Sequence, residues 1–156
     1  MFVSARLDYA LRALAVLPAP PGDPSTATQL ADDLEVSETY LRTTLNELRA
    51  GGLLVHERGP RGGYRLARPT ANITIGEVLA ALRIAAVEVH PTPRGMDELG
   101  RSLSTLWKHV EDSTVNLLSS ITVADVAEGN ALGSMSRCHD RSRADISEGA
   151  VERSAK

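Results

Sequence analysis

The chain has 156 residues, of which 42% are hydrophobic and 24% charged, a balance typical of a globular domain with its own core. Its net charge of −3 argues against a protein that coats nucleic acid, and no stretch reaches the roughly 20 apolar residues that span a bilayer. The single cysteine, Cys138, excludes an internal disulfide and an all-cysteine metal cage. Charged residues interrupt the N-terminal apolar run, so we expect no signal peptide and a cytoplasmic protein.

The first third of the chain predicts three helices. The first spans about residues 4–17 and ends before a cluster of prolines. A short second helix starts at Ser25 or Thr26, and Ser37 is a candidate N-cap for a third helix over 37–52 that ends at two glycines. The turn between the second and third helices is short, which indicates a helix-turn-helix.

The outward face of the third predicted helix is polar. It carries Thr39, Arg42, Thr43 and Asn46, whose i, i+3, i+4, i+7 spacing places them on one side. An α-helix fits the major groove of DNA, where hydroxyl, guanidinium and amide groups read base edges or bind phosphate. An ordinary solvated face is the alternative, but the adjoining helix-turn-helix and basic hairpin favour DNA reading.

A hairpin follows this helix directly. Residues 53–57 and 64–67 predict two short strands around the turn RGPRGG. The glycine spacing does not match a phosphate-binding loop, and a neutral surface turn would have to solvate four arginines. We therefore interpret the hairpin as the wing of a winged helix, with Arg58 and Arg61 reaching the DNA backbone or a minor groove, whose negative potential attracts arginine.

Helices also dominate the second half. A capping box, Thr74 with Glu77, opens a helix over residues 74–83. A proline-containing loop leads to a long helix from about Met96 to Ser119, and Thr122 is a candidate cap for a short final helix. The long helix has an apolar stripe and no helix of similar length to cover it, so we expect it to pair with its copy in a second subunit. The stripe consists of Leu99, Leu103, Leu106, Val110, Leu117 and Ile121.

The predicted fold class is mainly α with a small β-hairpin: a winged helix-turn-helix domain plus a long dimerisation helix. We expect four regions along the chain. They are a DNA-binding domain (1–84), a loop of the effector or sensor type (85–97), a dimerisation helix with a closing segment (98–130) and a disordered tail (131–156).

Four segments of the sequence resemble one family. SARLDYALRALAVL, TATQLADDLEVSETYLRTTLNELRAGGLLVHERGPRGGYRLARP, ITIGEVLAALR and LWKHVEDSTVNLLSSITVADV are similar to the Rrf2 family of bacterial transcriptional regulators, the IscR, NsrR and CymR type. The resemblance runs from Met1 to about Gly129, and RGPRGGYRLARP is its most specific part. It implies a homodimeric winged-helix regulator, with repression the favoured direction, that binds a short imperfect palindrome. The resemblance also implies these DNA contacts: Ser37, Thr39, Tyr40, Arg42 and Thr43, with Arg58, Gly59 and Pro60 in the wing.

The chain departs from this family at the sensor loop. Many members hold an iron–sulphur cluster through three cysteines there, whereas residues 85–97 contain none. The potential ligands left in the loop are Glu88, His90 and Asp97. Some relatives add a carboxylate and a histidine from the first helix; here those places hold Asp8 and Arg12, and arginine is not a ligand. We therefore expect neither a cluster nor another cofactor, and interpret Cys138 as an incidental thiol.

No catalytic arrangement accompanies these features, so we expect no enzyme. The expected partners are double-stranded DNA, a second copy of the chain and an effector, either a small molecule or a protein; no membrane is expected. Two alternatives remain open. One is a module that binds proteins and is controlled through an enzyme or other protein partner. The other is a metal or cluster sensor with non-cysteine ligands, such as Asp8 with His90.

Overall fold

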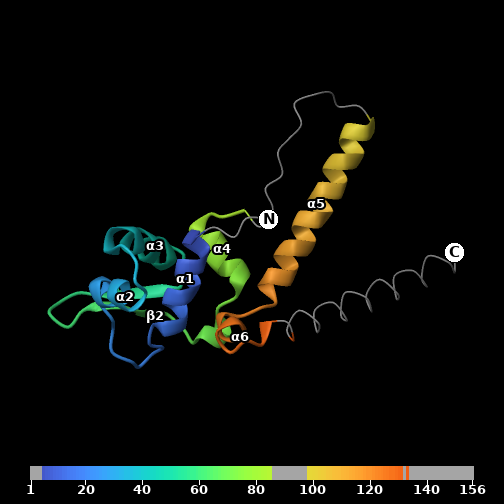
Figure 1. The fold of residues 1–156 in the computed structure, drawn as a ribbon. Helices are drawn as coiled ribbons and strands as arrows, with labels where there is room; N and C mark the ends of the chain where they lie inside the picture. The colour runs from blue at the N-terminus through green and yellow to red at the C-terminus, as the bar shows by residue number, and fades with distance from the viewer. Residues whose placement is uncertain (1–4, 86–97, 132, 134–156) are drawn as a thin grey trace.

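The computed structural model describes residues 5–85, 98–131 and 133. Its elements confirm the predicted fold class: the chain is mainly helical, with one antiparallel two-stranded hairpin. Helices α1 to α4 and the hairpin form one body, from which α5 projects (Figure 1). In chain order the elements are α1 (Ala5–Val16), α2 (Ala27–Asp33), α3 (Glu38–Ala50), β1 (Leu54–Glu57), β2 (Gly63–Leu66), the 3-10 helix η1 (Thr70–Asn72), α4 (Ile75–Leu82), α5 (Glu98–Ser119) and α6 (Val123–Ala127).

The predicted helix-turn-helix is formed by α2 and α3. A capping box begins α2: the Thr26 hydroxyl accepts from the Gln29 N–H at 3.2 Å, and the Gln29 side chain accepts from the Thr26 N–H at 2.9 Å. The chain then reverses within the four residues between the two helices, where Glu35 has a φ of +54°. This left-handed residue lies in the tight turn after which α3 packs against α2.

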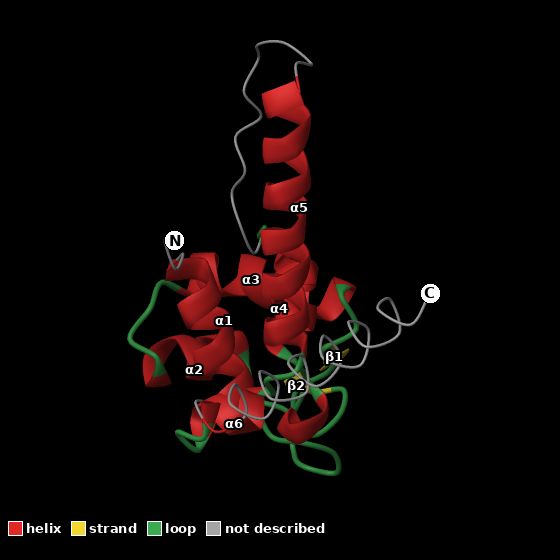
Figure 2. Cartoon of the chain, turned by 90° about the vertical axis from the view of Figure 1, so that its right-hand side faces the viewer, coloured by secondary structure: helices red, strands yellow, loops and turns green. Residues whose placement is uncertain are grey.

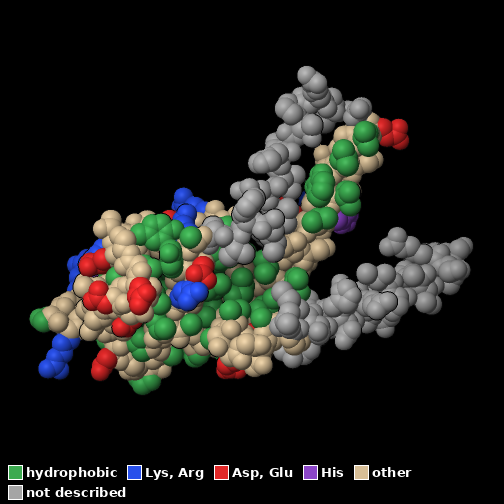
Figure 3. Space-filling model, viewed as in Figure 1, with side chains coloured by type: hydrophobic (Ala, Val, Ile, Leu, Met, Phe, Trp, Pro, Cys, Tyr) green, Lys and Arg blue, Asp and Glu red, His purple; other side chains and the backbone are tan. Residues whose placement is uncertain are grey.

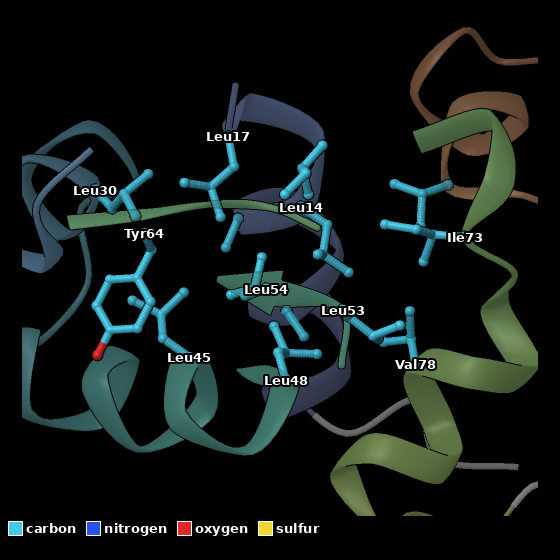
Figure 4. Packing of buried hydrophobic residues seen from close by; sticks show 14 of the residues in the cluster. Leu14, Leu17, Leu30, Leu45, Leu48, Leu53, Leu54, Tyr64, Ile73 and Val78 are labelled. Atoms are coloured by element: carbon cyan, nitrogen blue, oxygen red, sulfur yellow. The ribbon is translucent and has the colours of Figure 1, made fainter. Parts of the chain in front are cut away.

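A single apolar core holds α3 in place. Leu45 and Leu48 of α3 pack with Leu14 of α1, with the hairpin and with Val78 of α4 (Figure 4). The side chains of Leu14, Leu45 and Leu48 are fully buried. Because one side of α3 is immobilised in this way, its opposite side is presented to solvent in a fixed orientation.

The hairpin is anchored on both sides. β1 and β2 pair in register from Leu54 with Leu66 to Glu57 with Gly63. Tyr64 and Leu66 are buried, which confirms them as the anchors of the second strand. Ser25, just before α2, pairs with Tyr64 through N–H to carbonyl bonds of 2.9 and 2.7 Å. A Cβ on Gly63 would lie 2.4 Å from the Ser25 carbonyl oxygen, so this close approach requires glycine.

The segment after α5 returns to the core, which corrects one prediction. Ile121 was expected on the apolar stripe of the long helix, but it is only 2% exposed and belongs to the core of its own chain. The helix ends at Ser119, and the following residues pair with the start of α4: the Ile75 N–H donates to the Ile121 carbonyl at 2.8 Å. This backbone pairing attaches the C-terminal end of α5 to the main body.

Some predictions concern residues outside the described part of the chain. These are the starts of the first and long helices at Ser4 and Met96, the loop from residue 86 onward and Cys138. Ala131 is described, and it packs half-buried against the core although the tail was expected to be disordered from this residue. None of the described helices is both long and apolar enough to cross a membrane.

The cap of α4 leads to a prediction for stability. The Thr74 hydroxyl accepts from the Glu77 N–H, and the Thr74 N–H donates to the Glu77 carboxylate and lowers the pKa of that carboxyl. Replacing Thr74 with alanine should lower the free energy of unfolding by about 1 kcal/mol in a urea titration. The control Thr105→Ala removes an exposed hydroxyl within α5. It should change the free energy of unfolding by less than about half of that amount. Equal effects would contradict the role of the cap.

The same carboxylate gives this cap a pH dependence. Folding lowers the Glu77 pKa, so the carboxylate favours the folded state at neutral pH. That contribution is lost as the pH falls from the ordinary glutamate value through the folded-state value.

Candidate nucleic-acid interface

The outer face of α3 is polar and exposed, as its sequence pattern predicts. Thr39, Arg42, Thr43 and Asn46 are all exposed, whereas the leucines on the opposite face are buried. Tyr40 lies beside this face and is 41% exposed; its ring packs edge-on against Tyr9 of α1, with centroids 5.7 Å apart. The structure therefore brings these predicted residues together on one accessible surface.

The structure adds a detail for two residues of this surface, Ser37 and Asn46. Ser37 occupies the N-cap position of α3, but its side chain makes no capping hydrogen bond in the described structure, contrary to the expected cap. The exposed Ser37 hydroxyl is therefore not used in capping the helix. The Asn46 side-chain oxygen accepts from the Tyr64 hydroxyl at 3.3 Å, so it also connects α3 to β2.

The turn between β1 and β2 exposes the predicted wing residues. Arg58, Gly59, Pro60 and Arg61 are all exposed, and the tip closes through a Gly62 N–H to Gly59 carbonyl bond of 2.9 Å. Gly59 has a φ of +119°, a conformation that favours glycine. The tip extends beyond α2 and α3 at the left of Figure 1, and Lys and Arg side chains extend from this end in Figure 3.

The four arginines of the hairpin segment differ in their partners. Arg65 donates to Glu57 at 2.7 Å, and Arg68 pairs with the Glu77 carboxylate. Arg58 and Arg61 form no ion pair with any described residue. The two arginines at the base are thus engaged within the chain, and the two at the tip keep their charge available for an external anion.

A carboxylate that sequence reasoning missed contacts the central arginine of α3. Glu38 accepts from Arg42 and, at 3.0 Å, from the Thr28 hydroxyl of α2. These bonds, first that from Arg42 and then that from Thr28, lower the pKa of Glu38, while Glu38 raises the pKa of Arg42. The i, i+4 spacing of Glu38 and Arg42 was a sequence signal that could have identified the pair.

Helix α5 carries a second exposed feature, an apolar stripe. Leu99 is 67% exposed, Leu106 is 52% exposed and Trp107 is 45% exposed. Leu103 and Val110 continue the stripe, and Leu117 is half-buried against the core at the base of the helix. Figure 2 shows most of the helix projecting away from the main body, and Figure 3 shows hydrophobic side chains gathered along it. Such a row of apolar side chains is typical of an interface with another molecule.

Comparisons with known proteins agree on one family. A family model described as "Rrf2: Iron-dependent Transcriptional regulator" matches residues 3–129. The provisionally assigned HTH-type transcriptional regulator slr0846 of Synechocystis sp. is 32% identical over 129 residues, 81% of this chain and 87% of the relative. The HTH-type transcriptional regulator IscR of Citrobacter koseri is 28% identical over 155 residues, 96% of this chain and 91% of the relative. The structure of CymR, the global cysteine regulator of B. subtilis, is similar with a TM-score of 0.62 and 28% identity, covering 82% of this chain and 97% of CymR.

The family description names iron, and the structure describes only some of the candidate ligands. Among the described residues, no group of three or more His, Cys, Asp or Glu side chains is placed to hold a metal ion. Asp8 accepts from the Arg12 guanidinium at 2.8 Å, so a cation already stands beside this carboxylate. The other candidate ligands, Glu88, His90, Asp97 and Cys138, lie outside the described residues.

Proposed function

The chain belongs to the Rrf2 family of transcriptional regulators, and we propose that it acts in the cytoplasm as a homodimer that binds a short imperfect palindrome and represses transcription there. The observation that carries this proposal is the fixed, exposed polar face of α3 beside a hairpin tip whose two arginines form no ion pair with any described residue. This combination supplies groups for base edges and for phosphate at one end of the molecule.

Each part of this surface has a proposed role. The start of α3 enters the major groove, where Arg42 reads a base edge and the other polar side chains contact bases or phosphate. The wing tip approaches the backbone or the minor groove through Arg58 and Arg61, and Gly59 and Pro60 keep it narrow. The α3 contacts are Ser37, Thr39, Tyr40, Arg42, Thr43 and Asn46.

The proposed dimer explains the stripe on α5. Pairing of two such helices would bury Leu99, Leu103, Leu106 and Val110, with Leu117 at the edge of the interface. The two DNA-binding domains of the dimer, related by a two-fold axis, would then contact two half-sites. An inverted repeat is expected for this reason. In this proposal residues 1–84 bind DNA and residues 98–130 form the dimer.

We also propose that this regulator works without an iron–sulphur cluster. The support is the cysteine-free loop over residues 85–97 and the pairing of Asp8 with Arg12. The loop remains the proposed place where a small molecule or a protein effector acts. Protein purified without oxygen should therefore be colourless and free of iron while still binding DNA; a coloured, iron-containing protein would overturn this part.

The binding site can be identified by selection. The full chain is incubated with randomised duplex DNA, bound sequences are enriched, and the result is compared with genomic fragments bound in cells, starting with the promoter of the protein's own gene. The proposal predicts an imperfect inverted repeat with half-sites about one helical turn apart. Deletion of the gene should raise transcription from such promoters. No enriched sequence, or unchanged transcription, would contradict it.

Arg42→Ala should relax sequence preference at one position in each half-site. Loss of a bidentate base contact costs about 1–3 kcal/mol of discrimination. Affinities for operators substituted at every position, measured with parent and variant, identify the position. Arg49→Ala is the matched control, because Arg49 is an exposed arginine in the last turn of the same helix. If Arg42→Ala leaves preference unchanged at all positions, Arg42 does not read DNA.

A further inference from the structure

Glu38 begins α3 and accepts hydrogen bonds from two side chains, Arg42 of α3 and Thr28 of α2. One carboxylate oxygen accepts from Arg42 Nε at 3.1 Å and also from Arg42 Nη2. The other accepts from the Thr28 hydroxyl at 3.0 Å. Both oxygens are therefore used, and a residue of α2 fixes the carboxylate that in turn fixes the arginine of α3.

The two groups are charged in this arrangement. Hydrogen bonds from Arg42 and then from Thr28 lower the pKa of Glu38, so its carboxylate is ionised at neutral pH. Arg42 is still 53% exposed at its side chain, and Glu38 is 37% exposed. The pair thus lies at the surface, where a DNA groove would approach it, and is not a buried structural ion pair.

The geometry leaves one edge of the guanidinium free. Glu38 occupies the edge formed by Nε and Nη2, and Arg42 has no other acceptor among the described residues. The remaining edge, formed by Nη1 and the outer N–H of Nη2, can donate two parallel hydrogen bonds. The two acceptors of guanine in the major groove, O6 and N7, match such a fork.

The carboxylate also opposes contact with the wrong DNA. A negative charge next to the groove is repelled by phosphates, and this repulsion is offset only where Arg42 gains its two bonds to a base. At an unrelated sequence the repulsion remains without that gain. Glu38 therefore lowers affinity for unrelated duplex more than affinity for the operator.

From these contacts we infer that Glu38, held by Thr28, is a positioning residue that sets specificity by orienting Arg42 toward a guanine and by penalising unrelated DNA. This inference rests on the proposed function, in which Arg42 reads a base. It assigns a role to an acidic residue inside a surface whose other proposed contacts are neutral or basic.

The test is a double-mutant cycle on the selected operator. Affinities of the parent, Glu38→Gln, Arg42→Ala and the double variant are measured for the operator, for the operator changed at the Arg42-dependent position, and for a scrambled duplex. Asp33→Asn is the charge-matched control, since it removes one exposed carboxylate from α2. Thermal unfolding of each variant verifies that the fold is unchanged.

Glu38→Gln should reduce discrimination at the Arg42-dependent position by about three- to tenfold, a part of the full value of a bidentate contact. It should also bind the scrambled duplex more tightly than the parent does. In the Arg42→Ala background the same change should cause no further loss of discrimination, and Asp33→Asn should retain parental discrimination.

The outcomes separate this inference from the proposed function. If Arg42→Ala loses discrimination but Glu38→Gln keeps it, only the role of Glu38 is overturned. Equal losses from Glu38→Gln in the presence and absence of Arg42 would also overturn it, because Glu38 would then act independently of the arginine. If Arg42→Ala itself keeps full discrimination, the role of Glu38 and the proposed base reading by Arg42 are both overturned.

Discussion

Replacing Leu103 and Leu106 together with glutamate is expected to make the chain monomeric and to weaken operator binding by about 10²–10⁴-fold. Both side chains lie exposed on α5 and contribute little to the core of the single chain. Two negative charges per helix would oppose pairing of the two α5 helices. Each DNA-binding domain would then have to bind its half-site alone. Analytical ultracentrifugation gives the mass, and a DNA titration gives the affinity.

A matched pair of substitutions provides the control for this experiment. Thr105→Glu with Asn116→Glu adds the same charge to exposed positions of α5 outside the stripe. This control should remain dimeric and bind the operator as the parent does. A Leu103→Glu, Leu106→Glu variant that stays dimeric at full affinity would contradict the role assigned to α5.

Arg58→Ala is expected to weaken binding to every duplex and to make binding less dependent on salt. An exposed arginine without an ion pair among the described residues can neutralise a phosphate and release a counterion. Loss of one such contact in each subunit should reduce the slope of log affinity against log salt by about 2. Titrations of the operator and of a scrambled duplex between about 50 and 200 mM salt give this slope.

Lys108→Ala is the charge-matched control for this prediction. It removes a cation from the exposed surface of α5, away from the hairpin, and should leave the slope within about 0.5 of the parental value. A slope unchanged by Arg58→Ala would remove the wing tip from the interface, whatever happens to the absolute affinity.

Local signals in the sequence were sufficient for most of the fold. The structure confirms the capping box predicted at Thr74 and the candidate cap at Thr122, and it selects Thr26 over Ser25 as the cap of α2. The hairpin followed from turn residues between two short apolar runs. These features depend on neighbours within a few residues, so the sequence determines them locally.

Long-range contacts were harder to anticipate. Ile121 continued the spacing of the apolar stripe, but the backbone pairing with Ile75 turns it into the core. The sequence placed Arg58 and Arg61 at the tip of the hairpin, but only the folded chain shows that Arg65 pairs with Glu57 and that Arg58 forms no ion pair with any described residue. The bond from Thr28 to Glu38 joins two helices across the turn, and no periodicity within one helix predicts such a bond.

The central claim is that α3 and the wing tip together bind DNA with sequence specificity. Its most direct test is one titration of the parent and of the Arg42→Ala, Arg58→Ala double variant against the operator and a scrambled duplex. The parent should prefer the operator by about 10³-fold or more, and the double variant should lose affinity for both duplexes and most of this preference. Equal affinity of the parent for the two duplexes, or a double variant that binds as the parent does, would contradict the claim.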